Sequence, residues 1–269
     1  LLDRVAGGGY DAAVILTSFS QSPWPAGYLC RLAGVGVRVG MSKEFGGAGL
    51  THWVPAVPDD VHQVDRTLHL LRRVGVAPVD GRLHLSIPAA GYASAEAVLR
   101  DSGLHPEERY ALLLPGASCP ARRYDPGRFH AVAKTLTAAG LRTVVVGTAR
   151  EADLVARVAG DVPTAVQVAG RLDVPALAAA VAGSSVVVCN NSGGAHLASA
   201  AGTPVVVLFA GTEQVQQYAP RFTPAVVLTA PTACAPCRQM RCPYAAECLD
   251  LPPEMVAEEA LELAAVSAR

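Results

Sequence analysis

Short apolar runs alternate with polar turns and with segments of helical periodicity along the second half of the chain. The apolar runs are rich in Val and Leu and predict strands over residues 110–114, 143–146, 165–168, 186–188 and 205–209. The segments between them predict helices over 128–139, 151–158, 174–182 and 196–201. Strands that alternate with helices favour a parallel sheet, so we predict a doubly wound α/β domain.

The first half shows the same alternation less regularly. We expect strands over 11–17, 37–41 and 83–88, and helices over 27–33, 60–74 and 93–102; residues 45–58 read as a loop. In the helix over 60–74, His62, Asp65 and Arg66 read as solvated charges, or alternatively as a helix edge that lines a cleft between domains. Residues 103–108 are the expected linker. The predicted domains are therefore 1–108 and 109–269.

The stretch from residue 184 to residue 209, SSVVVCNNSGGAHLASAAGTPVVVLF, organises the rest of the chain. It predicts a strand, a polar turn, a helix and a second strand. Ser192 is placed to cap the helix, and the glycines beside it remove side chains where the backbone turns. Free amide groups at such a helix start attract phosphate. The turn therefore predicts a diphosphate site, the alternative being an ordinary turn of a parallel sheet.

Polar turns follow four of the expected strands, with the sequences PGAS, GTARE, AGRLD and NNSGGAH. Ligands of doubly wound sheets bind outside the carboxyl ends of the strands. We therefore expect the binding site along the edge that these turns share.

Several side chains in these turns suit a nucleotide. Ser118 and Arg122 suit a phosphate, with Arg123 beside them, although a turn hydroxyl and surface charges would look the same. Glu151 suits the hydroxyls of a ribose, or is a favourable charge in the first turn of a helix.

The other two candidates are less specific. Gly170 and Leu172 suit the close approach and apolar contact of a base, or form a plain connecting loop. His196 would donate a hydrogen bond to a phosphate oxygen, or is a structural histidine at a helix start. The chain has neither the GxGxxG nor the Walker pattern, and Ser192 does not lie in a GxSxG elbow.

Four of the seven cysteines cluster late in the chain, in the Cys-rich segment 234–248: Cys234, Cys237, Cys242 and Cys248. Their spacing is metal-like, and four thiolates would suit a structural zinc or iron ion with no open position for catalysis. The alternative is a loop of reduced or disulfide-linked cysteines.

Composition narrows the function classes. A net charge of −1 with 51% hydrophobic residues gives no sign of nucleic-acid binding or of an anionic-membrane surface. Neither a signal peptide nor an apolar run of transmembrane length is recognisable, so a cytoplasmic location is expected. The chain starts at Leu1 inside an expected helix, and we expect a native segment to precede it.

Together these segments resemble the bacterial heptosyltransferases of glycosyltransferase family 9. The resemblance rests on PGASCPARRYDPGRF, VVVGTAREADL, AGRLDVPALAAAVAGSSVVVCNNSGGAHLASAAGTPVVVLFAGT and CAPCRQMRCPYAAEC, in this order. It implies a GT-B-type fold of two Rossmann-like domains, the N-terminal one truncated here. It also implies an inverting glycosyltransferase that moves a sugar, heptose in the family, from an ADP-sugar to a hydroxyl acceptor. That acceptor would belong to a cell-surface glycan or a natural product, and catalysis would need no cofactor.

The resemblance also assigns donor-binding roles. Ser118 and Arg122 match a hydroxyl and a Lys that bind phosphate, Glu151 matches the ribose carboxylate, and Gly170 and Leu172 match the adenine pocket. The diphosphate turn is matched by Asn191, Ser192, Gly193 and His196, and a turn that faces the cleft by Gly211 and Thr212.

Three residues depart from the family pattern: Arg122 replaces a Lys, Tyr124 a Trp and Asn191 an Asp. The loop with the family's presumed base would precede Leu1, so the catalytic residue is left unassigned. Two alternatives therefore stay open: a non-catalytic nucleotide-binding module, and an assembly element in which the Cys cluster promotes oligomers.

Overall fold

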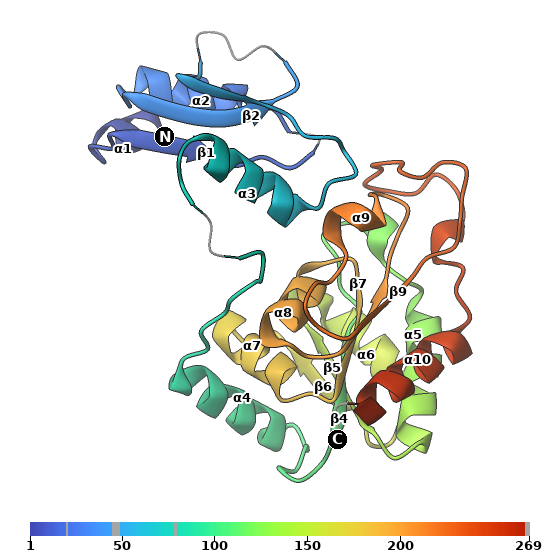
Figure 1. Cartoon of the computed structure of the whole chain (residues 1–269). Helices are drawn as coiled ribbons and strands as arrows, with labels where there is room; N and C mark the ends of the chain where they lie inside the picture. The colour runs from blue at the N-terminus through green and yellow to red at the C-terminus, as the bar shows by residue number, and fades with distance from the viewer. Residues whose placement is uncertain (20, 45–48, 78–79, 267–269) are drawn as a thin grey trace. The chain divides into compact units, whose positions relative to one another are not determined.

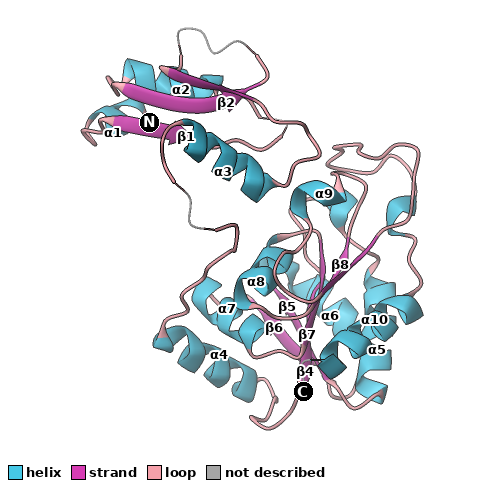
Figure 2. Cartoon of the chain, in the orientation of Figure 1, coloured by secondary structure: helices cyan, strands magenta, loops and turns pink. Residues whose placement is uncertain are grey.

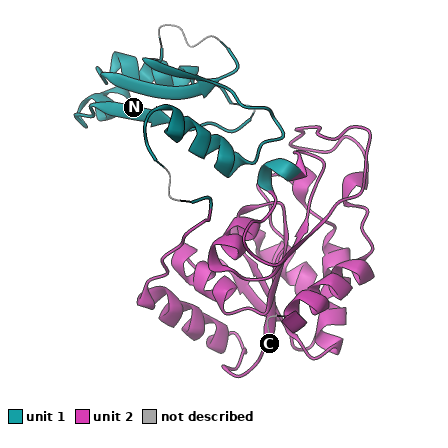
Figure 3. Cartoon of the chain, in the orientation of Figure 1, with its two compact units in different colours: residues 1–81, 216–218 teal, residues 82–215, 219–269 magenta. Residues whose placement is uncertain are grey.

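The computed structural model describes residues 1–19, 21–44, 49–77 and 80–266. The chain forms two compact units (Figure 3): Leu1–Gly81 with Gln216–Tyr218, and Arg82–Val215 with Ala219–Arg269. The division at residue 81 lies earlier than the linker expected at 103–108. Helix α4 (Ala89–Asp101) explains the difference, because it packs against α7 (Val174–Ala182) and so joins the second unit.

The second unit is built on a parallel sheet (Figure 2). Its described strands follow the order β6-β5-β4-β7-β8-β9. The strands are β4 (Tyr110–Leu114), β5 (Arg142–Gly147), β6 (Val166–Ala169), β7 (Val186–Asn190), β8 (Val205–Leu208) and β9 (Ala225–Leu228). The central strands are apolar throughout because both faces are covered, and Leu112 and Val187 are fully buried.

Helices cover both faces of this sheet (Figure 1). One face carries α5 (Pro126–Ala138), α6 (Ala152–Ala159) and α10 (Pro253–Val266), and the other carries α7 and α8 (Gly193–Ala201), with α4 outside α7. Asp125 caps the start of α5, since its carboxylate accepts the Arg128 N–H at 3.0 Å, and Asp173 caps α7 in the same way. The doubly wound α/β domain expected from the sequence is thus present.

The first unit contains a smaller parallel sheet in the order β1-β2-β3. Its strands are β1 (Ala12–Ile15), β2 (Val37–Ser42) and β3 (His52–Pro55), and its helices are α1 (Leu2–Ala6), α2 (Trp24–Leu32) and α3 (Gln63–Arg73). Val39, Met41, Val54 and Leu70 form its core. Among the described residues, no helix is long and apolar enough to span a membrane.

Two expectations for this part of the chain were wrong. Residues 83–88 form no strand; they run irregularly into Pro88, which precedes the first turn of α4. Residues 52–55, predicted as loop, form β3 at the edge of the sheet, where Pro55 is tolerated.

Arg66 is not a solvated charge. Its side chain is only 4% exposed, and its guanidinium lies 5.0 Å from the centre of the Phe19 ring. Burial lowers the pKa of Arg66, while Asp59 and Tyr218 act in the opposite direction. Arg66 is therefore part of the interior of the first unit.

Candidate functional site

The polar turns that follow the strands of the second unit lie along one edge of the sheet, because the strands are parallel. The PGAS turn after β4 is tied to the turn after β7 by Asn190, whose Nδ2 donates to the carbonyl oxygen of Pro115 at 2.8 Å. Asn190 Oδ1 also accepts the Tyr124 N–H at 3.0 Å, which orients the start of α5. Ser118 lies exposed in the same turn as Pro115.

Glu151 lies where the turns after β4 and β5 meet. Its Oε2 accepts hydrogen bonds from the Thr148 N–H at 3.0 Å and from Thr148 Oγ1 at 2.9 Å, and its Oε1 lies 3.5 Å from Arg123 Nη2. A Cβ added to Gly116 would collide with this carboxylate, so a larger residue there would force the Glu151 side chain to move. The Glu151 side chain is 18% exposed, and Oε1 keeps capacity to accept further hydrogen bonds.

Gly170 brings the turn after β6 against the turn after β5. Its N–H donates to the Gly147 carbonyl at 2.9 Å, its φ is +68°, and an added Cβ would lie 2.9 Å from the Ala149 nitrogen. Only glycine fits this conformation and spacing. Leu172 follows, half-buried, just before the Asp173 cap of α7.

Helix α8 starts at the centre of this edge. Ser192 occupies the predicted N-cap position with extended backbone, but its hydroxyl makes no capping hydrogen bond in the described part of the chain. The first-turn amide groups of α8 thus have no side-chain acceptor from the cap. A Cβ on Gly193 would meet nothing within 4 Å, which leaves open space beside these amides.

Asn191 connects the turns after β7 and β8. It is 7% exposed, and its Oδ1 accepts the Ala210 N–H at 3.1 Å. Within the described ranges its Nδ2 is buried without a hydrogen-bond partner. An Asp at this position, as in the resembled family, would place an acceptor oxygen where this chain has an N–H donor.

Arg122 reaches across the edge to the turn after β8. It ends the short helix η1 (Pro120–Arg122), its Nε donates to Thr212 Oγ1 at 3.1 Å, and its Nη2 lies 2.7 Å from Glu213 Oε1. Glu213 also acts on His196, which lies on α8 with part of its surface exposed to solvent. The pKa of His196 is lowered, mainly because neighbouring groups displace water from its ring, while Glu213 acts to raise it.

The backbone of the Cys-rich segment is hydrogen-bonded to the turn after β8 and to the helix η1. The Cys237 N–H donates to the Gly211 carbonyl at 2.8 Å, the Arg238 N–H to the Thr212 carbonyl at 3.1 Å, and the Ala121 N–H to the Met240 carbonyl at 3.2 Å. The segment therefore holds Thr212 and the helix η1 in place.

The thiols themselves are not arranged as metal ligands. All four cysteines are free, with Cys234 exposed and the other three partly exposed. Across the described residues, no three His, Cys, Asp or Glu side chains gather in a way that would hold a metal ion. Burial is the largest cause that raises the pKa of Cys248, and the other three cysteines add to it. The metal-binding alternative drawn from the cysteine spacing therefore finds no support among the described residues.

The structure brings the predicted donor residues to one edge and adds others that sequence reasoning did not select. Asn190 and Glu213 are the clearest additions. A usable signal existed for Glu213, because it follows β8 as the other polar turns follow their strands. Asn190 opens the NNSGGAH turn, but its role depends on contacts with residues 115 and 124 that no local pattern reveals.

The comparisons with known proteins agree with this picture. The model of glycosyltransferase family 9 (heptosyltransferase) matches residues 1–247. Lipopolysaccharide heptosyltransferase 3 of Escherichia coli is 26% identical over 215 residues, which make up 77% of this chain; the chain spans 61% of that protein.

Two solved structures share the fold. A glycosyl transferase family 9 protein from Veillonella parvula superposes with a TM-score of 0.78 at 22% identity, over 98% of this chain and 78% of that one. ADP-heptose LPS heptosyltransferase II of E. coli gives 0.74 at 19% identity, over 100% of this chain and 80% of that one. The resemblance seen in the sequence motifs and the GT-B-type α/β fold are confirmed, and the chain belongs to glycosyltransferase family 9.

Proposed function

We propose that this chain is an inverting glycosyltransferase that takes a sugar, heptose, from its ADP-linked donor and transfers it to a hydroxyl group of a cell-surface glycan or natural product. The observation that carries the proposal is the convergence of the turns after β4, β5, β6, β7 and β8 on one edge of the second unit. Family membership and the names of its relatives favour heptose and ADP.

Each part of the donor has a matching group at this edge. The diphosphate suits the first-turn amides of α8, the Arg122 guanidinium and Ser118. The ribose hydroxyls suit the free acceptor capacity of Glu151 Oε1. The base suits the space beside Gly170 and Leu172, where a glycine lets the backbone approach.

The same groups account for the chemistry of the transfer. A bond forms between the acceptor oxygen and the anomeric carbon while the bond from that carbon to the phosphate oxygen breaks. ADP leaves with the electron pair of the broken bond. The proton of the acceptor hydroxyl passes to a general base, a role that we assign to no described residue. Arg122 and the α8 amides stabilise the negative charge that grows on the departing diphosphate.

The test is a transfer assay in which ADP release is followed with ADP-heptose as donor and a heptose-deficient lipopolysaccharide core as acceptor. We expect acceptor-dependent ADP release, no release of UDP from UDP-glucose, and a rate that falls by roughly tenfold to a hundredfold in Arg122→Ala, because a charge-assisted contact is lost. Saturable ADP binding without turnover for any ADP-sugar would instead make the chain a non-catalytic nucleotide-binding module. Absence of ADP binding would refute the donor site itself.

A further inference from the structure

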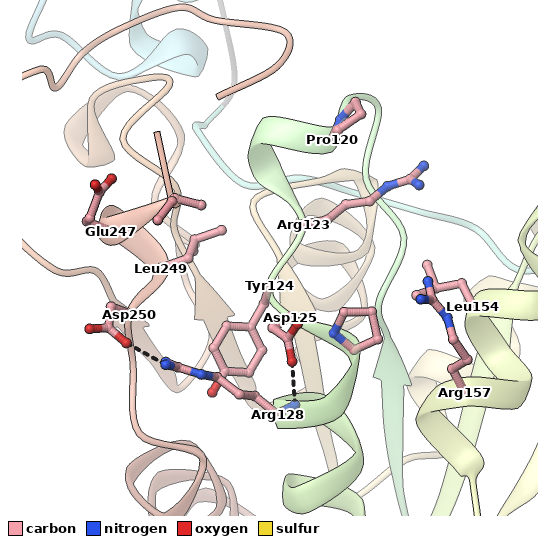
Figure 4. Close-up of a pocket in the computed structure, with 13 residues that line it drawn as sticks. Pro120, Arg123, Tyr124, Asp125, Arg128, Leu154, Arg157, Glu247, Leu249 and Asp250 are labelled. Atoms are coloured by element: carbon pink, nitrogen blue, oxygen red, sulfur yellow. Dashed lines mark hydrogen bonds and ion pairs between the residues drawn. The ribbon is translucent and has the colours of Figure 1, made fainter. Parts of the chain in front are cut away.

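A cavity lies beside the donor edge and is lined by other residues. It has a volume of about 710 Å³ and opens between the start of α5, helix α6 and the short helix η3 (Glu247–Leu249), as Figure 4 shows. None of the proposed donor-binding residues lines it. Its size falls within the usual range of small-molecule sites.

The floor of this cavity is apolar and fixed. Tyr124, Leu154 and Leu249 are buried beneath it. The Tyr124 hydroxyl donates to the Leu251 carbonyl at 2.7 Å, and its ring packs edge-on against Phe129 at 5.3 Å. The hollow is therefore backed by the core of the second unit, and its floor has little freedom to collapse.

The charges of the rim are segregated. In Figure 4, Arg123 and Arg157 stand on the side of α6, whereas Glu247 and Asp250 stand on the side of η3. Between them, Asp125 caps α5, and Arg128 pairs with Asp250 and donates to the Leu251 carbonyl at 3.0 Å. The charged side chains in the middle of the rim, Asp125 and Arg128, therefore already have partners within the protein.

One positive and one negative side chain, on opposite sides of the rim, have no such partner among the residues that the structure describes. Over the described ranges, the side chains of Arg157 and Glu247 take part in no hydrogen bond or ion pair. Arg123 has a weak partner, Glu151 Oε1 at 3.5 Å, and Asp250 shares its charge with Arg128. A ligand of a single sign would satisfy one side of the rim and face repulsion from the other.

We propose that this cavity binds a dipolar small molecule, with a phosphate or carboxylate group at Arg157 and Arg123 and an ammonium group at Glu247 and Asp250. An amino-sugar phosphate has this chemistry, and glucosamine 6-phosphate is a convenient probe. Two partial probes each lack one charge: glucose 6-phosphate lacks the ammonium group, and glucosamine lacks the phosphate.

The experiment measures the binding of these three probes to the whole chain by calorimetry. We expect glucosamine 6-phosphate to bind about tenfold more tightly than either partial probe, since its phosphate and its ammonium group each make a charge-assisted contact. Arg157→Ala should lower its affinity to that of glucosamine, and Glu247→Gln to that of glucose 6-phosphate. Arg157 is preferred to Arg123 for this test, because Arg123 also contacts Glu151.

The donor site supplies the control that separates this proposal from the proposed function. Saturating ADP should leave the affinity for glucosamine 6-phosphate unchanged, and Arg157→Ala should leave the affinity for ADP unchanged. Equal binding of the three probes, displacement of the probe by ADP, or no binding at all would overturn the inference, whatever the transfer assay shows.

Discussion

At the scale of single residues, the proposed phosphate-binding residue Arg122 already pairs with a carboxylate, that of Glu213. Arg122 lies 2.7 Å from Glu213 and 3.1 Å from the Thr212 hydroxyl, both in the turn after β8. A diphosphate that approaches Arg122 competes with Glu213 and is repelled by it. We therefore expect Glu213 to hold the Arg122 guanidinium in position and to lower the affinity for the proposed nucleotide.

Replacing this carboxylate gives a prediction with a definite sign. In Glu213→Gln the charge is removed while the length of the side chain is kept, so we expect the ADP dissociation constant to fall by roughly twofold to tenfold, as for a partly exposed ion pair. Calorimetry of the variant and of the native chain measures the difference. Weaker binding in Glu213→Gln would mean that positioning of Arg122 outweighs the repulsion.

His196 predicts a pH dependence of stability. Its pKa in the folded chain lies below its usual value, so the unfolded chain binds more protons near and below the usual range, about pH 6.5. Above that pH the ring is neutral in both states and costs no stability. As the pH falls towards the lowered pKa, the unfolded chain takes up the proton first, and the free energy of unfolding decreases. We expect His196→Gln to lose less unfolding free energy than the native chain between about pH 7.5 and pH 5.5.

Urea unfolding of both proteins at the two pH values provides the measurement. The difference between the two proteins isolates residue 196, because all other residues are common to both. Identical losses would show that His196 is not desolvated in the folded chain.

At the scale of elements, the contact between the turns after β5 and β6 can be tested with two glycines. Gly170 and Gly202 both have positive φ, +68° and +71°, but only Gly170 has neighbours where a Cβ would lie. Gly202→Ala should therefore cost about 1–2 kcal/mol for the left-handed conformation alone. Gly170→Ala should cost about 1–3 kcal/mol more, because the new methyl group overlaps Ala149.

Denaturant unfolding measures these costs, and ADP binding gives a second readout. We expect Gly170→Ala to weaken ADP binding and Gly202→Ala to leave it unchanged, since Gly202 ends α8 at its far side from the Ser192 cap. Equal destabilisation by the two substitutions would show that the turns after β5 and β6 do not press together.

Sequence patterns predicted most of the second unit because its elements are locally consistent. Helix α7 was predicted with its observed bounds, 174–182, and strand β4 with its bounds 110–114. The helix start at Gly193 was placed three residues late, at His196, because glycine is a poor helix former. Strand β9 and helix α10 were not predicted, and their positions depend on neighbours rather than on a sharp local pattern.

Site residues could be predicted where they lie in the turn directly after a predicted strand. They could not be predicted where their role depends on contacts between residues far apart in the sequence. Glu151, Asn191 and Ser192 lie in the expected turns. The bonds of Asn190 to Pro115 and of Arg122 to Thr212 connect residues that are 75 and 90 positions apart, and no spacing in the sequence reveals them. For the same reason, the burial of Arg66 against Phe19 was not foreseen.

At the scale of the whole molecule, the proposed donor-binding residues all belong to one unit, Arg82–Val215 with Ala219–Arg269. The first unit has its own sheet and core and contributes none of these residues. We therefore expect nucleotide binding to depend on the second unit, and we assign the smaller sheet to the acceptor side of the proposed reaction.

The most direct test of the account is a calorimetric titration of the 269-residue chain with ADP, repeated with Arg122→Ala and with Lys134→Ala as a matched loss of one cation. Lys134 lies on α5 with a long contact of 3.8 Å to Asp161 and takes no part in the donor edge. The account predicts one ADP bound per chain, affinity weakened by at least about tenfold in Arg122→Ala, and no change in Lys134→Ala. Equal affinity in all three proteins, or no saturable binding of ADP to the native chain, would contradict it.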